Sequence, residues 1–237
     1  MPRPLSLMTL VFVLLAASPA VAQKVDLSLI LGNIPSIGDT RTYTINTGGQ
    51  QVLEVTQVQF VGKAFRIVAR SEETGLPVSF LETFIVPGKQ RLLGSSESAP
   101  LSIIVTKPKR LERFVFKVGK LQRAVVKGVA FSGANLVGPA IWLAESEFQG
   151  FEAFDTGIDF FPETVRIRRA LGLGVTNAFT GDQVVAASSQ TSWSTPDLGA
   201  VAIQRRIVTY LNGFQQSDTG IQNLTLTSAV INGVSYP

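Results

Sequence analysis

Residues 51–61 read QVLEVTQVQFV, and after a Gly62-Lys63 step residues 65–70 read FRIVAR. Both stretches are rich in valine, isoleucine and phenylalanine, which are enriched in β-strands because branched and aromatic side chains pack well on a pleated surface. A short step that contains glycine, placed between two such stretches, is typical of a tight hairpin. We therefore expect these two stretches to form a pair of antiparallel strands.

The same strand-like pattern recurs along the rest of the chain. Turn residues interrupt it at Gly48-Gly49, Pro87-Gly88, Gly119-Lys120, 196–199 and Asn212-Gly213. Asn-Gly is the strongest of these hairpin signals, because both residues readily adopt positive φ angles. Further strands are expected at residues 41–45, 78–86, 113–118, 121–131, 183–193, 200–211 and 222–231. Residues 140–148 are the one place where we expect a helical turn.

This spacing predicts an all-β fold of about a dozen strands. We expect a single large curved antiparallel sheet that forms an open or partly closed barrel, with a β-sandwich as the alternative. No low-complexity linker divides the chain, so residues 23–237 are expected to form one domain. Two related halves are an alternative, because residues 34–40 and 161–174 both contain a proline followed by at least one glycine at the entry to a strand-rich stretch.

The N-terminus has the pattern of an export signal. Arg3 is followed by the uncharged run LSLMTLVFVLLAA at residues 5–17 and by Ala20-Val21-Ala22, a small-residue cleavage site. The apolar run is shorter than the roughly 20 residues that a membrane span needs, which argues against an uncleaved anchor and a transmembrane segment. We expect residues 1–22 to be a cleaved signal peptide and the mature protein, beginning at Gln23, to be periplasmic or extracellular.

The chain contains neither cysteine nor histidine. This excludes disulfides, thiolate metal sites, lipid attachment to cysteine, catalysis by Ser-His-Asp or Cys-His groups, and histidine-ligated metals. Carboxylate, lysine and tyrosine chemistry and oxygen-ligated cations stay open. We expect no catalytic residues, no cofactor and no metal, and therefore not an enzyme.

Charge is unevenly distributed along the chain. Residues 107–127 contain eight basic residues and one acid, Glu112, whereas residues 145–163 contain six acids and no base. The favoured interpretation is a pair of solvated basic strands beside an acidic connection that neutralises them. The alternative is a basic strip for an anionic partner such as lipid headgroups or an envelope polymer. Charged residues make up only 16% of the chain, against about 25% in soluble domains, and nucleic acid is not an expected partner.

Two further features each allow a structural and a functional interpretation. Asp155-Thr156-Gly157-Ile158-Asp159 has the carboxylates of a calcium loop without the spacing of an EF-hand, so surface turn chemistry is favoured, with an acid–base pair of glycosidase type as a remote alternative. Trp142 and Trp193 are expected to be half-buried sheet aromatics rather than ligand platforms.

The C-terminal region carries a resemblance. Residues 193–201, WSTPDLGAV, followed by Asn212-Gly213 and the closing stretch 224–226, resemble the ending of a loose group of uncharacterised bacterial secreted and envelope β proteins. Residues 34–43 are similar to the first strand of that group, with Arg41 where the group has tryptophan. The resemblance implies a curved sheet akin to the lipoprotein-carrier (LolA/LolB-like) half-barrels. It supplies no functional residues.

The leading functional hypothesis is a non-catalytic periplasmic or secreted protein that binds an apolar or lipid-like ligand on the curved sheet. The apolar face of the sheet would be lined or filled by bulky residues, namely Phe60, Phe65, Phe80, Phe84, Phe114, Phe116 and Phe131. The alternative is a structural or assembly component of the cell envelope that pairs through exposed sheet edges. A hydrolase that works through Asp155 and Asp159 is the remote alternative. The pattern predicts no specific ligand-binding residues.

Overall fold

The computed structural model describes residues 23–237, and the expected signal peptide, residues 1–22, lies outside this range. The described part contains one short helix, α1 (Ser28–Leu31), and sixteen strands. The strands are β1 (Lys24–Asp26), β2 (Thr40–Ile45), β3 (Gln50–Val61), β4 (Ala64–Glu73), β5 (Ser79–Val86), β6 (Gln90–Ser98), β7 (Leu101–Arg113), β8 (Val115–Lys117), β9 (Gln122–Ser132), β10 (Asn135–Asp155), β11 (Phe160–Thr176), β12 (Gln183–Thr195), β13 (Gly199–Leu211), β14 (Phe214–Asp218), β15 (Gln222–Ile231) and β16 (Val234–Tyr236).

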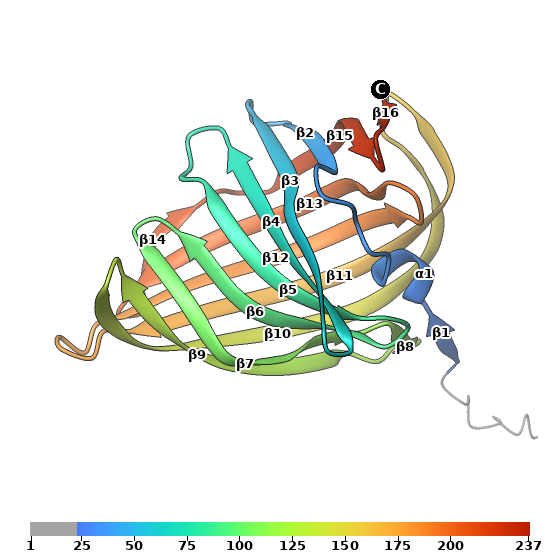
Figure 1. Ribbon diagram of the computed structural model, residues 1–237. Coiled ribbons are helices and arrows are strands. Elements are labelled where there is room, and N and C mark those ends of the chain that lie inside the picture. The colour runs from blue at the N-terminus through green and yellow to red at the C-terminus, as the bar shows by residue number, and fades with distance from the viewer. Residues whose placement is uncertain (1–22) are drawn as a thin grey trace, which may run out of the picture.

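Fourteen of these strands form one antiparallel sheet, which curls into a barrel (Figure 1). The order is β14-β13-β12-β11-β10-β9-β7-β6-β5-β4-β3-β2-β15-β16, and β13 also pairs with β15. That additional pairing closes a ring of twelve strands, which leaves β14 and β16 as short extensions. The expected all-β fold with a single large curved antiparallel sheet is therefore confirmed. The curvature proceeds to full closure, further than the half-barrel that the resemblance implied.

The turns at Gly62-Lys63 and Asn212-Gly213 form as expected, but the strand that follows Asn212-Gly213 is β14 and not the expected stretch 222–231. β3 and β4 pair from Val61 and Ala64 at the turn to Gln51 and Glu73 at the far end. At the β13–β14 turn, Asn212 and Gly213 have φ angles of 52° and 84°. Positive φ at both central residues is the requirement of the tight turn that matches the twist of paired strands.

The helical turn expected at residues 140–148 is wrong, because this stretch lies within β10. Its even-numbered residues (Ala140, Trp142, Ala144, Ser146 and Phe148) are buried, and the residues between them are intermediate or exposed. This is the two-residue period of a strand with one face covered. Alanine, leucine and glutamate favour helices locally, but pairing with β9 on one side and β11 on the other overrides that weak preference.

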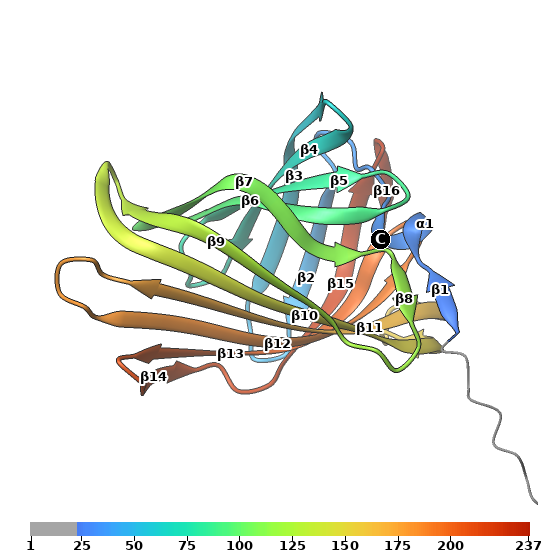
Figure 2. The same cartoon turned by 90° about the horizontal axis from the view of Figure 1, so that it is seen from below.

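One end of the barrel is filled by an end plug, which we define as Leu27, Leu31, Phe114 and Phe116. These side chains, all at most 5% exposed, pack against inward residues of the ring at Val55, Ile67, Ile85, Phe148, Val165 and Ile167. α1, β1 and β8 lie together at this end in both views (Figures 1 and 2). β1 pairs with β8, and the Leu27 amide donates to the Phe114 carbonyl, which holds the plug together. The Phe114 amide donates to the carbonyl of Lys89 in the β5–β6 turn, which connects the plug to the ring.

The phenylalanines singled out in the sequence do not lie on one shared apolar face. Phe114 and Phe116 are fully buried in the end plug, whereas Phe60 is 62% exposed and contacts Phe65 at a ring distance of 5.0 Å. Because Phe80 and Phe84 alternate with the inward Ile85 along β5, they lie on the outer face. Strand periodicity predicts on which face of a strand a side chain lies, but not what packs against that face. It therefore cannot distinguish these locations.

Two further apolar clusters cover separate parts of the inner face. One joins β2, β13 and β15 and includes Tyr43, Val201 and Leu224. The other joins β6, β7, β9, β10 and β11 and includes Val126 and Trp142. Each cluster is built on neighbouring strands, so the two lie on different sides of the ring. Within residues 23–237, no helix has the length and hydropathy needed to cross a membrane.

Candidate ligand site inside the barrel

The most distinctive polar group of the inner face is Glu112, which lies between two arginines. Arg91 Nη1 is 3.2 Å from Glu112 Oε1, and Arg169 Nε is 3.2 Å from Glu112 Oε2. Arg91 and Glu112 are cross-strand partners on β6 and β7, whereas Arg169 comes from β11. The three side chains are called the ionic cluster below. It holds two positive charges against one negative charge.

Burial and neighbouring charges shift the pKa values of Glu112 and Arg91 in opposite directions. Burial alone would raise the pKa of Glu112, but the positive charges of Arg169 and Arg91 and the hydrogen bond from Arg169 hold it below its ordinary value. Burial lowers the pKa of Arg91, and the charge of Glu112 offsets part of this effect. Glu112 is therefore ionised at neutral pH and fixes both guanidinium groups in place.

A cavity of about 140 Å³ adjoins the ionic cluster. It is lined by Arg91, Leu111, Glu112, Ala144, Glu145, Ser146, Arg169, Ala170, Leu171, Ser188 and Gln190. This volume is well above the roughly 15 Å³ that one water molecule needs. Glu112 is only 3% exposed, whereas the side chains of Arg91 and Arg169 are 29% and 24% exposed. The two arginine side chains are thus partly exposed beside a buried carboxylate.

One lining residue of this cavity has an unmet hydrogen bond. Ser146 Oγ is buried and has no hydrogen-bond partner, although Ser146 is the cross-strand neighbour of Arg169. A buried hydroxyl without a partner costs roughly 1–3 kcal/mol. By contrast, Arg169 Nη1 donates to Ser192 Oγ at 3.0 Å, and Arg91 Nη2 donates to the Leu31 carbonyl at 2.9 Å. The arginines are anchored, and the serine hydroxyl is available.

Beyond the ionic cluster the inner face becomes apolar and accessible. Along β11 the inward positions run from Ile167, which is fully buried, through Arg169 to Leu171, which is 40% exposed. Val184 of β12 and Leu211 of β13 are cross-strand partners on the same face and are 42% and 39% exposed. We call the inner face around these accessible side chains the lumen. The β9–β10 and β11–β12 hairpins lie at the end of the barrel opposite α1, β1 and β8 (Figure 1).

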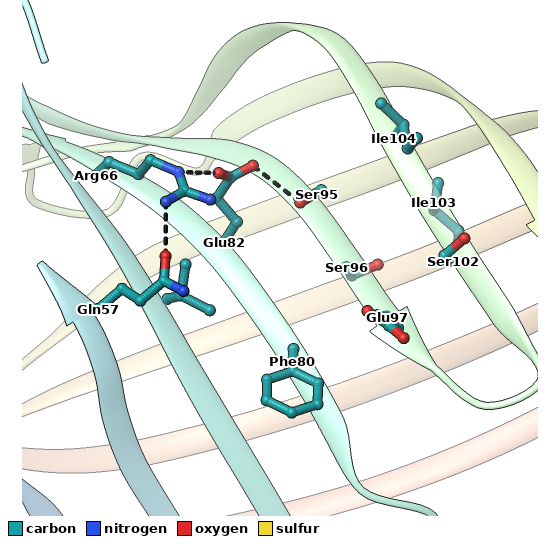
Figure 3. A pocket seen from close by; sticks show the side chains of 11 residues that line it. Gln57, Arg66, Phe80, Glu82, Ser95, Ser96, Glu97, Ser102, Ile103 and Ile104 are labelled. Carbon is teal, nitrogen blue, oxygen red and sulfur yellow. Dashed lines mark hydrogen bonds and ion pairs between the residues drawn. The ribbon is translucent and has the colours of Figure 1, made fainter. Parts of the chain in front are cut away.

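A larger hollow of about 440 Å³ lies on the outer face over β3 to β7 (Figure 3). Arg66 and Glu82 form an ion pair there, Arg66 Nη1 donates to Gln57 Oε1 at 2.8 Å, and Ser95 Oγ donates to Glu82 Oε2 at 2.9 Å. These polar groups satisfy one another. The outer hollow is therefore a weaker candidate for a ligand site than the cavity beside Ser146.

The structure shows where the charged residues of the basic run and the acidic run lie. All eight basic residues of 107–127 are exposed, which fits solvated basic strands. Arg123 of this run pairs with Glu145 at 2.8 Å, because β9 and β10 place them opposite each other. Glu147 and Glu152 pair with Arg168 and Arg166 of β11 instead. Only Glu112, the single acid of the basic run, enters the inner face.

The Asp155–Asp159 segment forms the turn between β10 and β11. Asp155 Oδ1 accepts a hydrogen bond from the Gly157 amide at 2.7 Å, and Asp159 Oδ1 accepts one from the Phe160 amide at 2.8 Å. Both carboxylates thus stabilise the turn backbone, as aspartates commonly do in turns. Residues 23–237 bring together no group of three or more acidic side chains suited to a metal ion.

The two tryptophans differ in their surroundings. Trp142 is 3% exposed and packs in the inner cluster of β6 to β11, so it is more deeply buried than expected. Trp193 is partly buried, as expected, and lies 4.7 Å from the ring of Phe154 while its indole Nε1 donates to Glu152. Trp142 therefore packs within the inner wall of the barrel, and Trp193 connects β12 to β10 through its contacts with Phe154 and Glu152.

Sequence reasoning missed Arg91, Ser146 and Arg169 and noted Glu112 only as an isolated acid. The available signal was that Glu112 and Phe114 lie two residues apart, and so on one face of an extended segment, with Arg113 on the other face. An acid at a core-facing position implies a buried partner. The partner Arg169 is 57 residues away, which no local pattern can identify.

Comparison with known proteins shows a distant likeness in fold. No protein-family model and no curated protein matches the chain. A candidate lipoprotein from Parabacteroides distasonis is 10% identical, with a TM-score of 0.48 over 82% of this chain and 96% of that one. A candidate exported protein with a YmcC-like fold from Bacteroides fragilis is 12% identical, with a TM-score of 0.47 over 86% of this chain and 97% of that one. The resemblance to lipoprotein carriers stays a prediction.

Proposed function

We propose that this protein is a non-catalytic exported binding protein that holds a lipid-like ligand in the lumen of its barrel. The observation that carries the proposal is the accessibility of apolar side chains on the inner face. Leu171, Val184 and Leu211 face inward by their register, yet each remains about two-fifths exposed. An acyl chain that covered them would gain roughly 25 cal/mol for each Å² of apolar surface removed from water.

The shape of the inner face supports a ligand that enters from one end. The end plug fills the far end of the barrel, so a ligand in the lumen would meet a closed floor near Phe116 and Ile167. Exposed apolar surface on an inner wall is unusual in a protein that has no ligand, because such surface is normally buried by the core itself. The export part of the proposal depends on the signal pattern at residues 1–22.

Assembly through sheet edges has less support. The ring of twelve strands closes on itself, and β14 and β16 are short extensions of five and three residues. β7 and β9 pair only from Leu101 to Ile104, so the facing edges along the rest of these two strands are also unpaired, although Gln122 covers part of this edge through hydrogen bonds to the backbone of Arg113 and Val115. Closure of a barrel is the most complete way of removing edges that could pair with another chain. The geometry of Asp155 and Asp159 does not favour the hydrolase alternative, since both carboxylates accept hydrogen bonds from turn amides.

Titration of the purified protein with a fluorescent fatty acid tests the proposal, with two matched variants. Leu171→Gln changes an accessible residue of the inner face, and Leu143→Gln changes a 55% exposed residue of the outer face of the same sheet. We expect Leu171→Gln to weaken probe binding at least fivefold and Leu143→Gln to leave it unchanged. Absence of saturable binding to the wild-type protein, or equal loss in both variants, would contradict the proposal.

A further inference from the structure

We propose that the lumen ligand carries an anionic head group, a carboxylate or a phosphate ester, which binds beside Arg91, Arg169 and Ser146. This inference rests on the proposed function and specifies its ligand. The cavity next to the ionic cluster has a volume of about 140 Å³, which suits a head group of either kind but not an acyl chain.

The charge of the ionic cluster favours an anion. Two guanidinium groups face one carboxylate, so the cluster retains one net positive charge. Glu145, another acid at the cavity, is paired with Arg123 at 2.8 Å and does not neutralise it. A partly buried charge without a counter-charge is unfavourable, and a bound anion would supply that counter-charge through charge-assisted hydrogen bonds.

The unpartnered hydroxyl of Ser146 is a second, independent indication. Ser146 is 4% exposed, lines the cavity and has an Oγ atom with no hydrogen-bond partner. A hydroxyl can donate to an anionic oxygen, so a bound head group would satisfy it. Ser188 and Gln190 of β12 lie on the opposite side of Arg169 and line the same cavity, which adds polar groups around the head group.

The order of residues along β11 sets the orientation of the ligand. Ile167 belongs to the core at the end plug, Arg169 to the ionic cluster and Leu171 to the accessible lumen wall. These alternate residues point to one face of the strand, two residues or about 7 Å apart. A ligand whose charged end lies at Arg169 would therefore extend its apolar chain over Leu171 toward the end with the β9–β10 and β11–β12 hairpins.

Calorimetric titration with three C16 probes tests the inference: palmitate, hexadecyl phosphate and the uncharged hexadecanol. We expect palmitate or hexadecyl phosphate to bind the wild-type protein at least tenfold more tightly than hexadecanol, and the stronger of the two identifies the head group. Equal affinity for all three would overturn the head-group inference while leaving the proposed function intact. Failure of all three to bind would overturn both.

Ser146→Asp gives the sharpest variant, because it supplies a carboxylate next to Arg169. We expect it to remove the preference for the anionic probes and to leave hexadecanol binding within twofold of the wild type. Ser189→Asp, on the exposed outer side of β12, is the matched control and should keep the preference. If Ser146→Asp does not fold, Ser146→Ala should still reduce the preference at least threefold. An unchanged preference in the folded Ser146 variant would contradict the inference.

Discussion

Arg205 of β13 and Glu73 of β4 form an ion pair, although 132 residues separate them in the chain. Each side chain is only 10% exposed, and Arg205 also donates to Gln222 of β15 at 3.0 Å. β13 and β15 pair through only four residue pairs, from Ala202–Thr225 to Arg205–Gln222. The ion pair thus lies beside the short β13–β15 pairing that closes the ring and connects β13 with β4 across it.

We expect Glu73→Gln to lower the free energy of unfolding by about 3 kcal/mol, because it leaves Arg205 charged and buried without its partner. Urea denaturation followed by circular dichroism measures the change. The double variant Glu73→Leu with Arg205→Met should recover much of this loss. As a control, Glu145→Gln breaks the exposed pair with Arg123, whose side chain is 75% exposed, and should cost no more than about 1 kcal/mol. Equal costs in both single variants would contradict the structural role of the buried pair.

The end plug should contribute strongly to stability. Phe116→Ala removes a fully buried side chain from the cluster formed with Leu27 and Ile167 and is expected to cost about 3–5 kcal/mol. Phe214→Ala, at a residue that is 75% exposed, should change the free energy of unfolding by less than about 0.5 kcal/mol. Thermal or urea denaturation of the two variants provides the comparison. A small effect at Phe116 would mean that the plug is not packed against the ring.

Glu112 should make the barrel sensitive to acid. Its pKa is lower in the folded protein than its ordinary value of 4.5, so its contribution to stability is complete above that value. The contribution is lost as the pH falls through the lower, folded-state pKa, where the carboxylate between Arg91 and Arg169 takes up a proton. We expect Glu112→Gln to be less stable than the wild type at pH 7. We also expect the difference between them to shrink as the pH falls from 5 to 3, in urea titrations at each pH. A constant difference would contradict this linkage.

The β13–β14 turn requires glycine at position 213. Because Gly213 has a φ of 84°, Gly213→Ala forces a Cβ atom into a left-handed conformation and should cost about 1 kcal/mol. Gly174→Ala on β11 is the control, since its backbone φ is ordinary for any residue and a Cβ there meets no atom within 4 Å. The control should not lower the melting temperature. A greater loss at Gly174 than at Gly213 would contradict the turn assignment.

The sequence by itself predicted many of the strands, several of the turns and the excluded chemistries, but it did not predict β6, β7, β10, β11 or β14. Alternation of side chains with a period of two is a local property, so the β3–β4 pair and the Asn212-Gly213 turn could be predicted from neighbouring residues. The absence of histidine and cysteine depends on composition alone. The strand at 140–148 was missed because its local preferences are mixed and its partners, β9 and β11, decide its conformation.

Only the tertiary structure decided that the sheet closes, which faces remain accessible and which charges meet inside. Closure depends on β13 pairing with β15 as well as β12. The ionic cluster depends on Arg91 and Glu112 of the consecutive strands β6 and β7 meeting Arg169 of β11, which is 57 residues from Glu112 in the chain. Contacts of this kind are set by the register of the whole ring and by the loops between its strands. A local pattern shows on which side of a strand a residue lies, whereas the closed ring determines what that residue meets there.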